Sequence, residues 1–346
     1  MTEMQQPHGK GTPDLALSGW VEYGGRRLSG DEILSLLRED PCAALHFGGE
    51  FSFTCGEWQG RDHFGIAPGD GPAGTLTRNG AFIGRIDPGY PAGDLEAAII
   101  EAVALRAVDG AAVALSGGVD SALVAAVARL PCVVVGLEGS HDLVRALALA
   151  EALGLSCEAV TVTEREVEAA LREVVGVLGD PNPVDASIAT TESFVARWAG
   201  ERGYRRILAG QGADELFGGY ARYLESPDLA ASLAAGVDDI PRQVARDSAV
   251  ASLYGTAFSL PYLDLRVVAA ARAIPPAEKV CGGVRKLPLR KVAERHLPLE
   301  FARGEKKAMQ YGSGIWKAIG HLSRANGYKK SVQGYLTDMG RDMHGH

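Results

Sequence analysis

From residue 95 to about residue 208, short apolar segments alternate with longer segments whose apolar residues recur at helical spacing. A short apolar run is typical of a strand covered on both faces, and helical spacing predicts an amphipathic helix. The predicted strands are 111–115, 132–137, 157–162 and 206–208, and the predicted helices are 95–108, 122–129, 143–153, 164–177 and 190–202. This alternation predicts an α/β fold in which helices flank a parallel sheet, followed by a mainly helical part from Asp228 onward.

Residues 15–90 show a different pattern, in which glycines separate short segments of alternating polarity. The one predicted helix is 31–38, and the predicted strands are 20–23, 44–47, 50–55 and 80–86. A proline- and glycine-rich segment, 87–93, predicts a domain boundary. We therefore expect a small, mainly β module over residues 1–90, an α/β domain with a helical C-terminal part over 91–330, and a polar C-terminal tail over 331–346.

Composition narrows the class of protein. With 346 residues, of which 46% are hydrophobic and 23% charged, the chain is typical of a soluble globular enzyme. A net charge of −8 disfavours nucleic acid as the main partner, and the apolar runs are too short to span a bilayer. Five scattered cysteines and the absence of a signal-peptide pattern favour a reduced, cytoplasmic protein without a membrane partner. The oligomeric state stays open, a homo-oligomer included.

Candidate chemistry first appears after the first of the predicted parallel strands, where residues 115–121 read Leu-Ser-Gly-Gly-Val-Asp-Ser. The two glycines lack a Cβ, so their backbone N–H groups can approach phosphate oxygens, and the following helix points its positive end at the same place. Ser116 and Ser121 add hydroxyl donors. Asp120 would repel a phosphate, so we interpret it as a Mg²⁺ ligand. A Walker A motif is absent, and the alternative is a turn in which Asp120 caps the helix.

A second glycine-rich run, Gly-Gln-Gly-Ala-Asp-Glu-Leu-Phe-Gly-Gly-Tyr at 210–220, follows the predicted strand 206–208. It places a second carboxylate, that of Asp214, on a turn after a strand. Ligands of α/β proteins bind at the carboxyl ends of the strands, so we expect Asp120 and Asp214 at the same edge of the sheet. Together the two runs favour an enzyme that splits ATP between its α and β phosphates to activate a carboxylate.

The two runs resemble those of the asparagine synthetase family, in the ATP pyrophosphatase (PP-loop) group. The resemblance covers about residues 94–320 and is also carried by residues 135–142, residues 260–264, and Lys286, Leu289, Arg290, Leu297, Pro298, Arg303 and Lys306. It implies an adenine nucleotide α-hydrolase-like domain. It also implies a carbon–nitrogen ligase: ATP converts a small-molecule carboxylate to an acyl-adenylate with release of pyrophosphate, and ammonia or an amine then attacks the acyl carbon.

The resemblance further implies ATP and Mg²⁺ as cofactors, and a role for each matching residue. Asp120 and Asp214 match the Mg²⁺ ligands, and Lys306, six residues before Gly312, matches a lysine that contacts the reacting phosphates. Lys307 is the alternative, and the two lysines also fit a solvated charged pair. The catalytic set is then Lys306, Asp214 and Gln211. The residues implied to bind ATP are Leu115, Ser116, Gly117, Gly118, Asp120, Ser121, Val135 and Gly210.

The chain departs from the family pattern at two places that bear on the second half of the reaction. Gln211 stands where many asparagine synthetases have a glutamate that can take a proton from ammonia. An amide cannot act as a base near neutral pH, although it can orient the nucleophile through hydrogen bonds. Residues 185–192 also lack the family's arginine and proline pattern. Aspartate is therefore not assigned as the substrate, and the carboxylate stays unidentified.

The N-terminal module resembles a shortened remnant of the family's glutaminase domain, at residues 49–53 and 61–68. Glutamine-using members carry a nucleophilic cysteine directly after the initiator methionine, whereas this sequence has Thr2. We therefore expect the chain not to use glutamine by itself, and to take ammonia or an amine, for which a separate amidotransferase is one source. A threonine nucleophile at Thr2 is disfavoured because the surrounding glutamine-binding pattern is missing.

Three other functions fit parts of the sequence. A β-lactam-synthetase-like enzyme would form an amide within one molecule, but those members disturb the Gly-Ala-Asp-Glu-Leu-Phe-Gly-Gly run, which is intact here. A tRNA-modifying PP-loop ATPase would need a basic face, which the composition does not favour. A non-catalytic nucleotide sensor would not need to retain the metal and phosphate residues. An AMP-forming amide ligase is therefore the preferred hypothesis.

Overall fold

The protein is described by a computed structural model that covers residues 14–304, 309–329 and 331–344. The chain divides into two compact units, Met1–Gly89 and Tyr90–His346, called here the first and second units. Within the three described ranges, no helix has the combination of length and apolar surface that a bilayer crossing needs.

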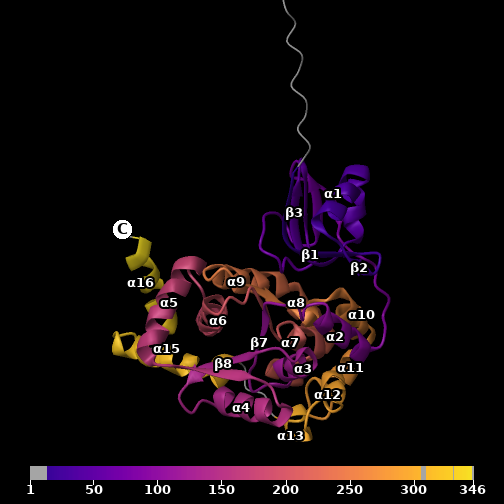
Figure 1. The fold of residues 1–346 in the computed structure, drawn as a ribbon. Helices are drawn as coiled ribbons and strands as arrows, with labels where there is room; N and C mark the ends of the chain where they lie inside the picture. Colours follow the sequence, from indigo (N-terminus) through magenta and orange to yellow (C-terminus); the bar gives the residue numbers. More distant parts are fainter. Residues whose placement is uncertain (1–13, 305–308, 330, 345–346) are drawn as a thin grey trace, which may run out of the picture. The chain divides into compact units, whose positions relative to one another are not determined.

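The first unit is built on an antiparallel sheet of six strands in the order β2-β1-β3-β4-β5-β6. Its elements are β1 (Leu15–Tyr23), β2 (Arg26–Arg27), α1 (Gly30–Glu39), β3 (Gly48–Cys55), β4 (Trp58–Arg61), β5 (Thr75–Arg78) and β6 (Ala81–Arg85). Phe51 and Phe53 of β3 share a buried core with Ile33 of α1. The helix therefore covers one face of this sheet, as Figure 1 shows.

Two sequence predictions for the first unit need correction. The segment 44–47, predicted as a strand, belongs to the 3₁₀ helix Pro41–His46 and its C-cap. Asp40 accepts a hydrogen bond from the Cys42 backbone N–H and Pro41 fixes the first turn, so this stretch starts as a helix despite its apolar residues. Strands β2, β4 and β5 were not predicted, because with two to four residues each they are too short to show alternation.

The second unit contains a five-stranded parallel sheet, which confirms the predicted fold class. Its strands are β7 (Ala111–Ala114), β8 (Cys132–Leu137), β9 (Cys157–Val162), β10 (Arg206–Leu208) and β11 (Ala257–Ser259). On one face, α3 (Val119–Ala128) contacts β7, and α4 (His141–Leu153) contacts β8. On the other face, α6 (Pro183–Glu201) contacts β8 and β10, and α9 (Ile240–Ser252) contacts β11 (Figure 1). Of the five strands in this sheet, β11, with three residues, was the one not predicted from the sequence.

The strand order β11-β10-β7-β8-β9 determines where a ligand can enter the sheet. The chain runs outward from β7 to β8 to β9 and then returns to the other side of β7, where β10 pairs with it. The loops after β7 and β10 therefore leave in opposite directions. Open α/β sheets bind ligands in the crevice at such a switch point. Both glycine-rich runs begin at this crevice.

The remainder of the second unit is helical, as predicted from Asp228 onward. Its other helices are α2 (Leu95–Ala104), α5 (Glu164–Leu178), α7 (Ala213–Phe217), α8 (Leu229–Asp238), α10 (Leu265–Ala273), α11 (Pro276–Lys279), α12 (Leu287–Ala293), α13 (Leu299–Ala302), α14 (Met309–Gly312), α15 (Ile315–Ala325) and α16 (Val332–His344). Short 3₁₀ helices span Ala221–Leu224 and Pro261–Leu263.

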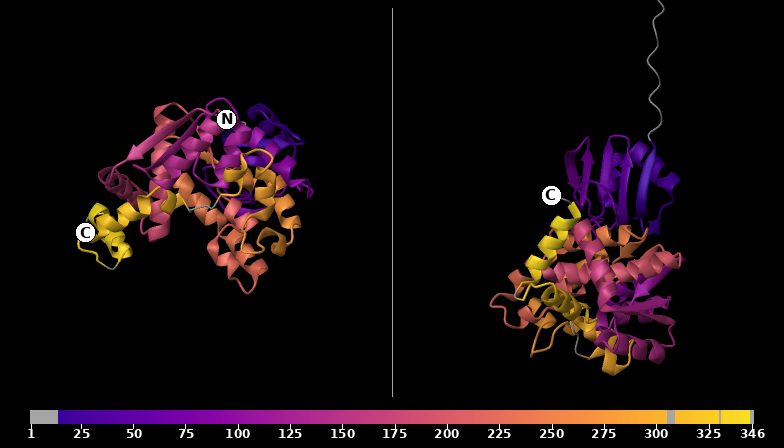
Figure 2. Two further views of the ribbon diagram at one scale, coloured as in Figure 1. Left: turned by 90° about the horizontal axis from the view of Figure 1, so that it is seen from below. Right: turned by 90° about the vertical axis from the view of Figure 1, so that its left-hand side faces the viewer.

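The C-terminal segment 331–346, expected as a polar tail, contains helix α16. Tyr335, Leu336 and Met339 are buried on one side of this helix, and α16 contacts α5 and α15. Figure 2 shows the C-terminal helices, coloured yellow, gathered at one edge of the second unit. Polar residues and two glycines separate the apolar residues of α16, which explains why the sequence indicated a polar tail.

Candidate active site

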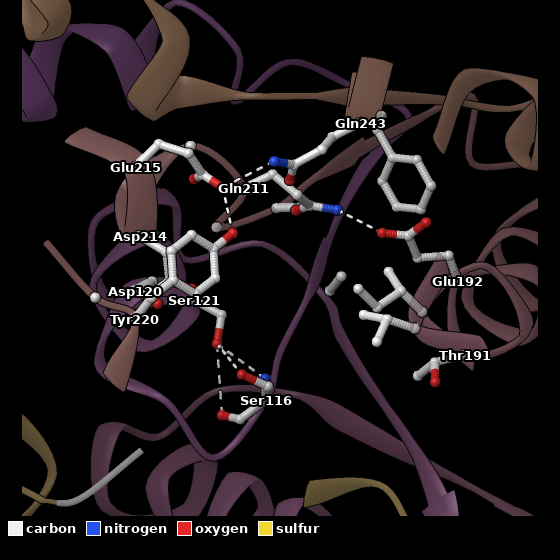
Figure 3. Close-up of a pocket in the computed structure, with 18 of the residues that line it drawn as sticks. Ser116, Asp120, Ser121, Thr191, Glu192, Gln211, Asp214, Glu215, Tyr220 and Gln243 are labelled. Atoms are coloured by element: carbon white, nitrogen blue, oxygen red, sulfur yellow. Dashed lines mark hydrogen bonds between the residues drawn. The ribbon is translucent and has the colours of Figure 1, made fainter. Parts of the chain in front are cut away.

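A cavity of about 690 Å³ lies in the second unit where the loops after β7 and β10 meet α6 and α9. Figure 3 shows Ser116, Ser121 and the two aspartates at one side of this cavity and Glu192 at the other. The sequence-predicted residues that line it are Leu115, Ser116, Asp120, Ser121, Val135, Gly210, Gln211 and Asp214. The structure thus brings together residues that are up to a hundred positions apart in the chain.

The loop after β7 is held by serine hydroxyls. The Ser116 backbone N–H donates to Ser121 Oγ at 2.9 Å, the two hydroxyl oxygens lie 2.9 Å apart, and the Gly118 N–H donates to Ser116 Oγ at 3.3 Å. Gly118 is the N-cap of α3 and provides no side-chain cap. Because a helix N-terminus has unpaired N–H groups and a positive dipole end, this loop is suited to an anion such as a phosphate.

Gly117, the other predicted loop residue, is not among those lining the cavity, and it serves close packing. A Cβ there would lie 3.0 Å from Asp142 Oδ1 and 3.1 Å from Arg145 Cβ, so a larger residue would push α4 slightly away from the loop. Arg145 Nε also donates to the Gly117 carbonyl oxygen at 3.2 Å. Gly117 therefore lets α4 support the loop from behind.

The carboxylates of Asp120 and Asp214 converge on one cation, the ammonium group of Lys286. Lys286 Nζ donates to both Asp120 carboxylate oxygens at 2.7 Å and lies 2.5 Å from Asp214 Oδ1. Asp120 and Lys286 are both buried, and Asp214 is largely so. The prediction that the two aspartates share a site is consistent with this geometry, whereas Lys286 is a site residue that the sequence reasoning missed. Its only signal was its position within the resemblance to the family.

The close approach of the two loops depends on two other features. A Cβ on Gly210 would lie 3.0 Å from Asp120 Cβ and 3.1 Å from the Ser121 backbone nitrogen, so glycine allows β10 to reach α3. Tyr262, in the run 260–264, donates its hydroxyl proton to the Asp120 carbonyl oxygen at 2.9 Å. These contacts fix the first turn of α3, and with it the Asp120 carboxylate.

The paired aspartates have the donor chemistry of a Mg²⁺ site. Three carboxylate oxygens converge on one point that already holds a positive charge, and Mg²⁺ in nucleotide sites takes one or two carboxylates and completes its shell with phosphate oxygens and water. In the part of the chain that the structure describes, no cluster of three or more His, Cys, Asp or Glu side chains could hold a metal by itself. The residues therefore fit a metal ion that arrives with a phosphate ligand.

Gly219 gives a first prediction. A Cβ at this position would overlap Asp214 Oδ1 and Lys286 Cε, so Gly219→Ala must push the aspartate and the lysine apart. We expect the variant to fold and to lose at least about tenfold in the rate of ATP turnover, because a misplacement of about 1 Å can cost that much or more. Turnover and thermal unfolding are measured beside Gly93→Ala, where the added Cβ meets open space. Unchanged turnover in Gly219→Ala would contradict this role for Gly219.

The other side of the cavity holds a network of acids and arginines. Gln211 Nε2 donates to Glu192 Oε1 at 2.8 Å and, more weakly, to Asp247 Oδ2 at 3.5 Å. Arg246 donates to Asp247 at 2.8 Å and to Asp185 at 2.6 Å. Burial and the nearby Asp247 charge raise the pKa of Glu192 well above its ordinary value. For Asp185, burial raises the pKa, but Arg246 and Arg242 outweigh it, and the net pKa is lowered.

Glu215, which follows Asp214 in the chain, holds the loop after β10 in place. It is buried and accepts hydrogen bonds from the Tyr220 hydroxyl and, at 3.1 Å, from Gln243 Nε2. Burial, followed by the charge of Asp214, raises its pKa. These bonds tie the loop to α9. Lys306 and Lys307 lie outside the described residues, so their predicted roles stay predictions.

The fold and the site together define an α/β protein with two glycine-rich loops at the switch point of a parallel sheet. A family model described as asparagine synthase matches residues 94–253 and 240–330. The chain belongs to the asparagine synthetase family of ATP-dependent ligases.

Known relatives support this membership. A provisionally named asparagine synthetase (glutamine-hydrolysing) of Methanocaldococcus jannaschii is 32% identical over 68% of this chain and 51% of its own length. Asparagine synthetase B (glutamine-hydrolysing) of Escherichia coli is 28% identical over 58% of this chain and 41% of its own. The chain thus spans about half or less of the length of these relatives. A structure of NMN synthetase from Francisella tularensis aligns with 69% of this chain at 13% identity, with a TM-score of 0.29, too low to carry an argument.

Proposed function

We propose that the second unit is an AMP-forming amide ligase, which uses ATP to activate a carboxylate as an acyl-adenylate and passes the acyl group to ammonia or an amine. One observation carries the proposal: the buried Asp120 and the largely buried Asp214 converge on a cation beside the uncapped N-terminus of α3. In this proposal, a phosphate would bind at the α3 N-terminus and a divalent cation at the aspartates beside it. The cavity between these aspartates and Glu192 has room for the acyl group and its acceptor.

In this proposal, the chain's own residues hold the leaving pyrophosphate. Ser116, Ser121 and the α3 N-terminus donate hydrogen bonds to the β and γ phosphates. Asp120 and Asp214 hold Mg²⁺, which would neutralise the charge that builds up on the pyrophosphate. Lys286 adds a fixed positive charge beside this ion, and such preorganised charge is the main source of catalysis in phosphoryl chemistry. Lys306, or alternatively Lys307, would add a second.

We assign residues to the adenosine and a chemical class to the acyl acceptor. Leu115, Val135 and Gly210 would enclose the adenosine, chiefly through backbone groups and apolar contact. We assign ammonia or an amine, rather than glutamine, as the immediate acyl acceptor.

The proposal is tested by incubating the full chain with ATP, Mg²⁺, ammonium and a panel of carboxylates, and identifying the nucleotide product by mass. We expect AMP and pyrophosphate with at least one carboxylate, because the loop binds the β and γ phosphates as one leaving group. ADP and phosphate would contradict the proposal. ATP binding without any product across the panel would favour a nucleotide sensor instead.

A further inference from the structure

Glu192 is a buried acid in the wall of the cavity that the proposed reaction leaves without a role. It lies in the middle of α6 and is 1% exposed. The adjacent hydroxyls of Thr190, Thr191 and Ser193 all donate to backbone carbonyl oxygens of the same helix. The Glu192 side chain instead reaches across the cavity wall to Gln211, as Figure 3 shows. Its second carboxylate oxygen, Oε2, is buried and has no hydrogen-bond partner.

The charges that face Glu192 do not include a matched cation. Arg246 on α9 is already shared between Asp247 and Asp185, and Arg242 is shared between Asp185 and Asp239. Among the described residues, no ion pair reaches Glu192 itself. The group therefore holds more acids than cations, and a ligand that brings a positive charge or a transferable proton would complete it.

The pKa of Glu192 is raised, as expected for a buried acid beside a second carboxyl group. Burial first, then the charge of Asp247 and a hydrogen-bonding contact with its carboxyl group, raise the pKa of Glu192, while Arg246 and the Gln211 hydrogen bond oppose the shift. A base works best when its pKa lies near the pH at which the enzyme operates, and buried carboxylates in clefts are tuned in this direction. The direction of the pKa shift thus agrees with the contacts of Glu192, which carry the argument.

We propose that Glu192 is the base that accepts a proton from the attacking amine, in place of the carboxylate that position 211 lacks. The inference rests on the proposed function. In the step assigned to it, the amine nitrogen forms a bond to the acyl carbon, and one N–H proton passes to a Glu192 carboxylate oxygen. The acyl C–O bond to the phosphate breaks, and its electron pair leaves on the oxygen of AMP.

Gln211 is then a positioning residue. Its amide donates to Glu192 Oε1, while Oε2 accepts no hydrogen bond. A glutamate at 211 would place a third carboxylate against Glu192 and Asp247, so the residues at 192 and 211 should be interchangeable only as a pair. This reciprocity predicts a behaviour that a purely structural role would not produce.

The test compares Glu192→Gln, Gln211→Glu and the double variant, using a carboxylate that gives AMP with the unaltered chain. Pyrophosphate release in a single turnover and amide yield are measured with ammonium and with hydroxylamine, whose low basicity makes it less dependent on a base. We expect Glu192→Gln to keep the pyrophosphate burst, to lose at least about tenfold in amide formation from ammonium, and to lose much less with hydroxylamine. The double variant should recover most of the loss. Glu201→Gln, at the exposed end of the same helix, is the matched control.

The pH dependence of the free energy of unfolding gives a second test, which does not depend on enzyme activity. Because the pKa of Glu192 is raised in the folded state, the folded chain holds this proton more tightly than the unfolded chain does. Below the ordinary pKa of 4.5, Glu192 does not lower the free energy of unfolding, and above it Glu192 lowers that free energy as the pH rises. Glu192→Gln should therefore be more stable than the unaltered chain at pH 8, with the gain vanishing towards pH 4.5. A variant that unfolds more easily at every pH would mark Glu192 as structural and overturn the assignment.

The outcomes separate the inference from the function on which it rests. Normal ammonium-dependent amide formation in Glu192→Gln, while the unaltered chain makes AMP, would overturn the role of Glu192 alone. An equal loss with ammonium and hydroxylamine would also overturn it. No AMP from the unaltered chain with any carboxylate would overturn the proposed function, and the assignment of Glu192 with it.

Discussion

Replacing Asp120 by asparagine should lower the single-turnover rate of pyrophosphate release by at least about two orders of magnitude while leaving the fold intact. Asp120 contributes two of the three carboxylate oxygens that converge on Lys286 Nζ. Asparagine has nearly the same shape but no charge, and loss of one preorganised electrostatic contact at a reacting group costs about 10²- to 10³-fold. The variant should also need a higher Mg²⁺ concentration for half-maximal rate, because one of the two candidate metal ligands is lost.

The measurement for Asp120→Asn is a single-turnover assay at several Mg²⁺ concentrations, with circular dichroism to verify folding. Glu201→Gln, in which an exposed carboxylate becomes an amide, is the control for the chemical change itself. Near-normal pyrophosphate release by Asp120→Asn would sink the metal assignment. An unchanged Mg²⁺ dependence with a reduced rate would instead assign Asp120 to the orientation of Lys286.

Much of this site could be predicted from the sequence because its parts are local. Each glycine-rich run lies directly after an apolar strand, so the topology of a parallel sheet brings Asp120 and Asp214 to one edge without knowledge of side-chain contacts. The parallel sheet itself follows from the alternation of apolar strands and amphipathic helices. Strand β11 was missed because three residues carry no period.

The parts that escaped prediction depend on contacts between distant residues. Lys286 lies 166 positions from Asp120, and no local pattern marks it as the partner of two carboxylates. Its backbone is in the left-handed region, with φ of 58°, just before α12. Glu192 looks in the sequence like a polar position on a helix that could face solvent. Its burial follows from the packing of α6 against β8 and β10, which the period of α6 alone does not determine.

The second large effect is expected for Lys286→Met, and it has two components. Without the ammonium group, the rate of pyrophosphate release should fall by at least about two orders of magnitude, because a fixed cation at the reacting phosphates is lost. In the absence of Mg²⁺ and ATP, the variant should also be less stable by about 3 kcal/mol, because removing one partner leaves buried carboxylates uncompensated. Lys286→Arg should not restore activity, since a planar guanidinium cannot take the place of a compact ammonium between two carboxylates.

The two components are separated by adding Mg²⁺ during unfolding. In Lys286→Met the two aspartates face each other without a counter-charge, so Mg²⁺ should stabilise this variant more than it stabilises the unaltered chain. Lys291→Met, an exposed position on α12, controls for the loss of a lysine from the same helix. If Lys286→Met lost stability but kept its rate, Lys286 would be only a counter-charge for the two aspartates. If it lost rate but not stability, the buried ion pair would contribute nothing to folding and the lysine would serve the phosphates alone.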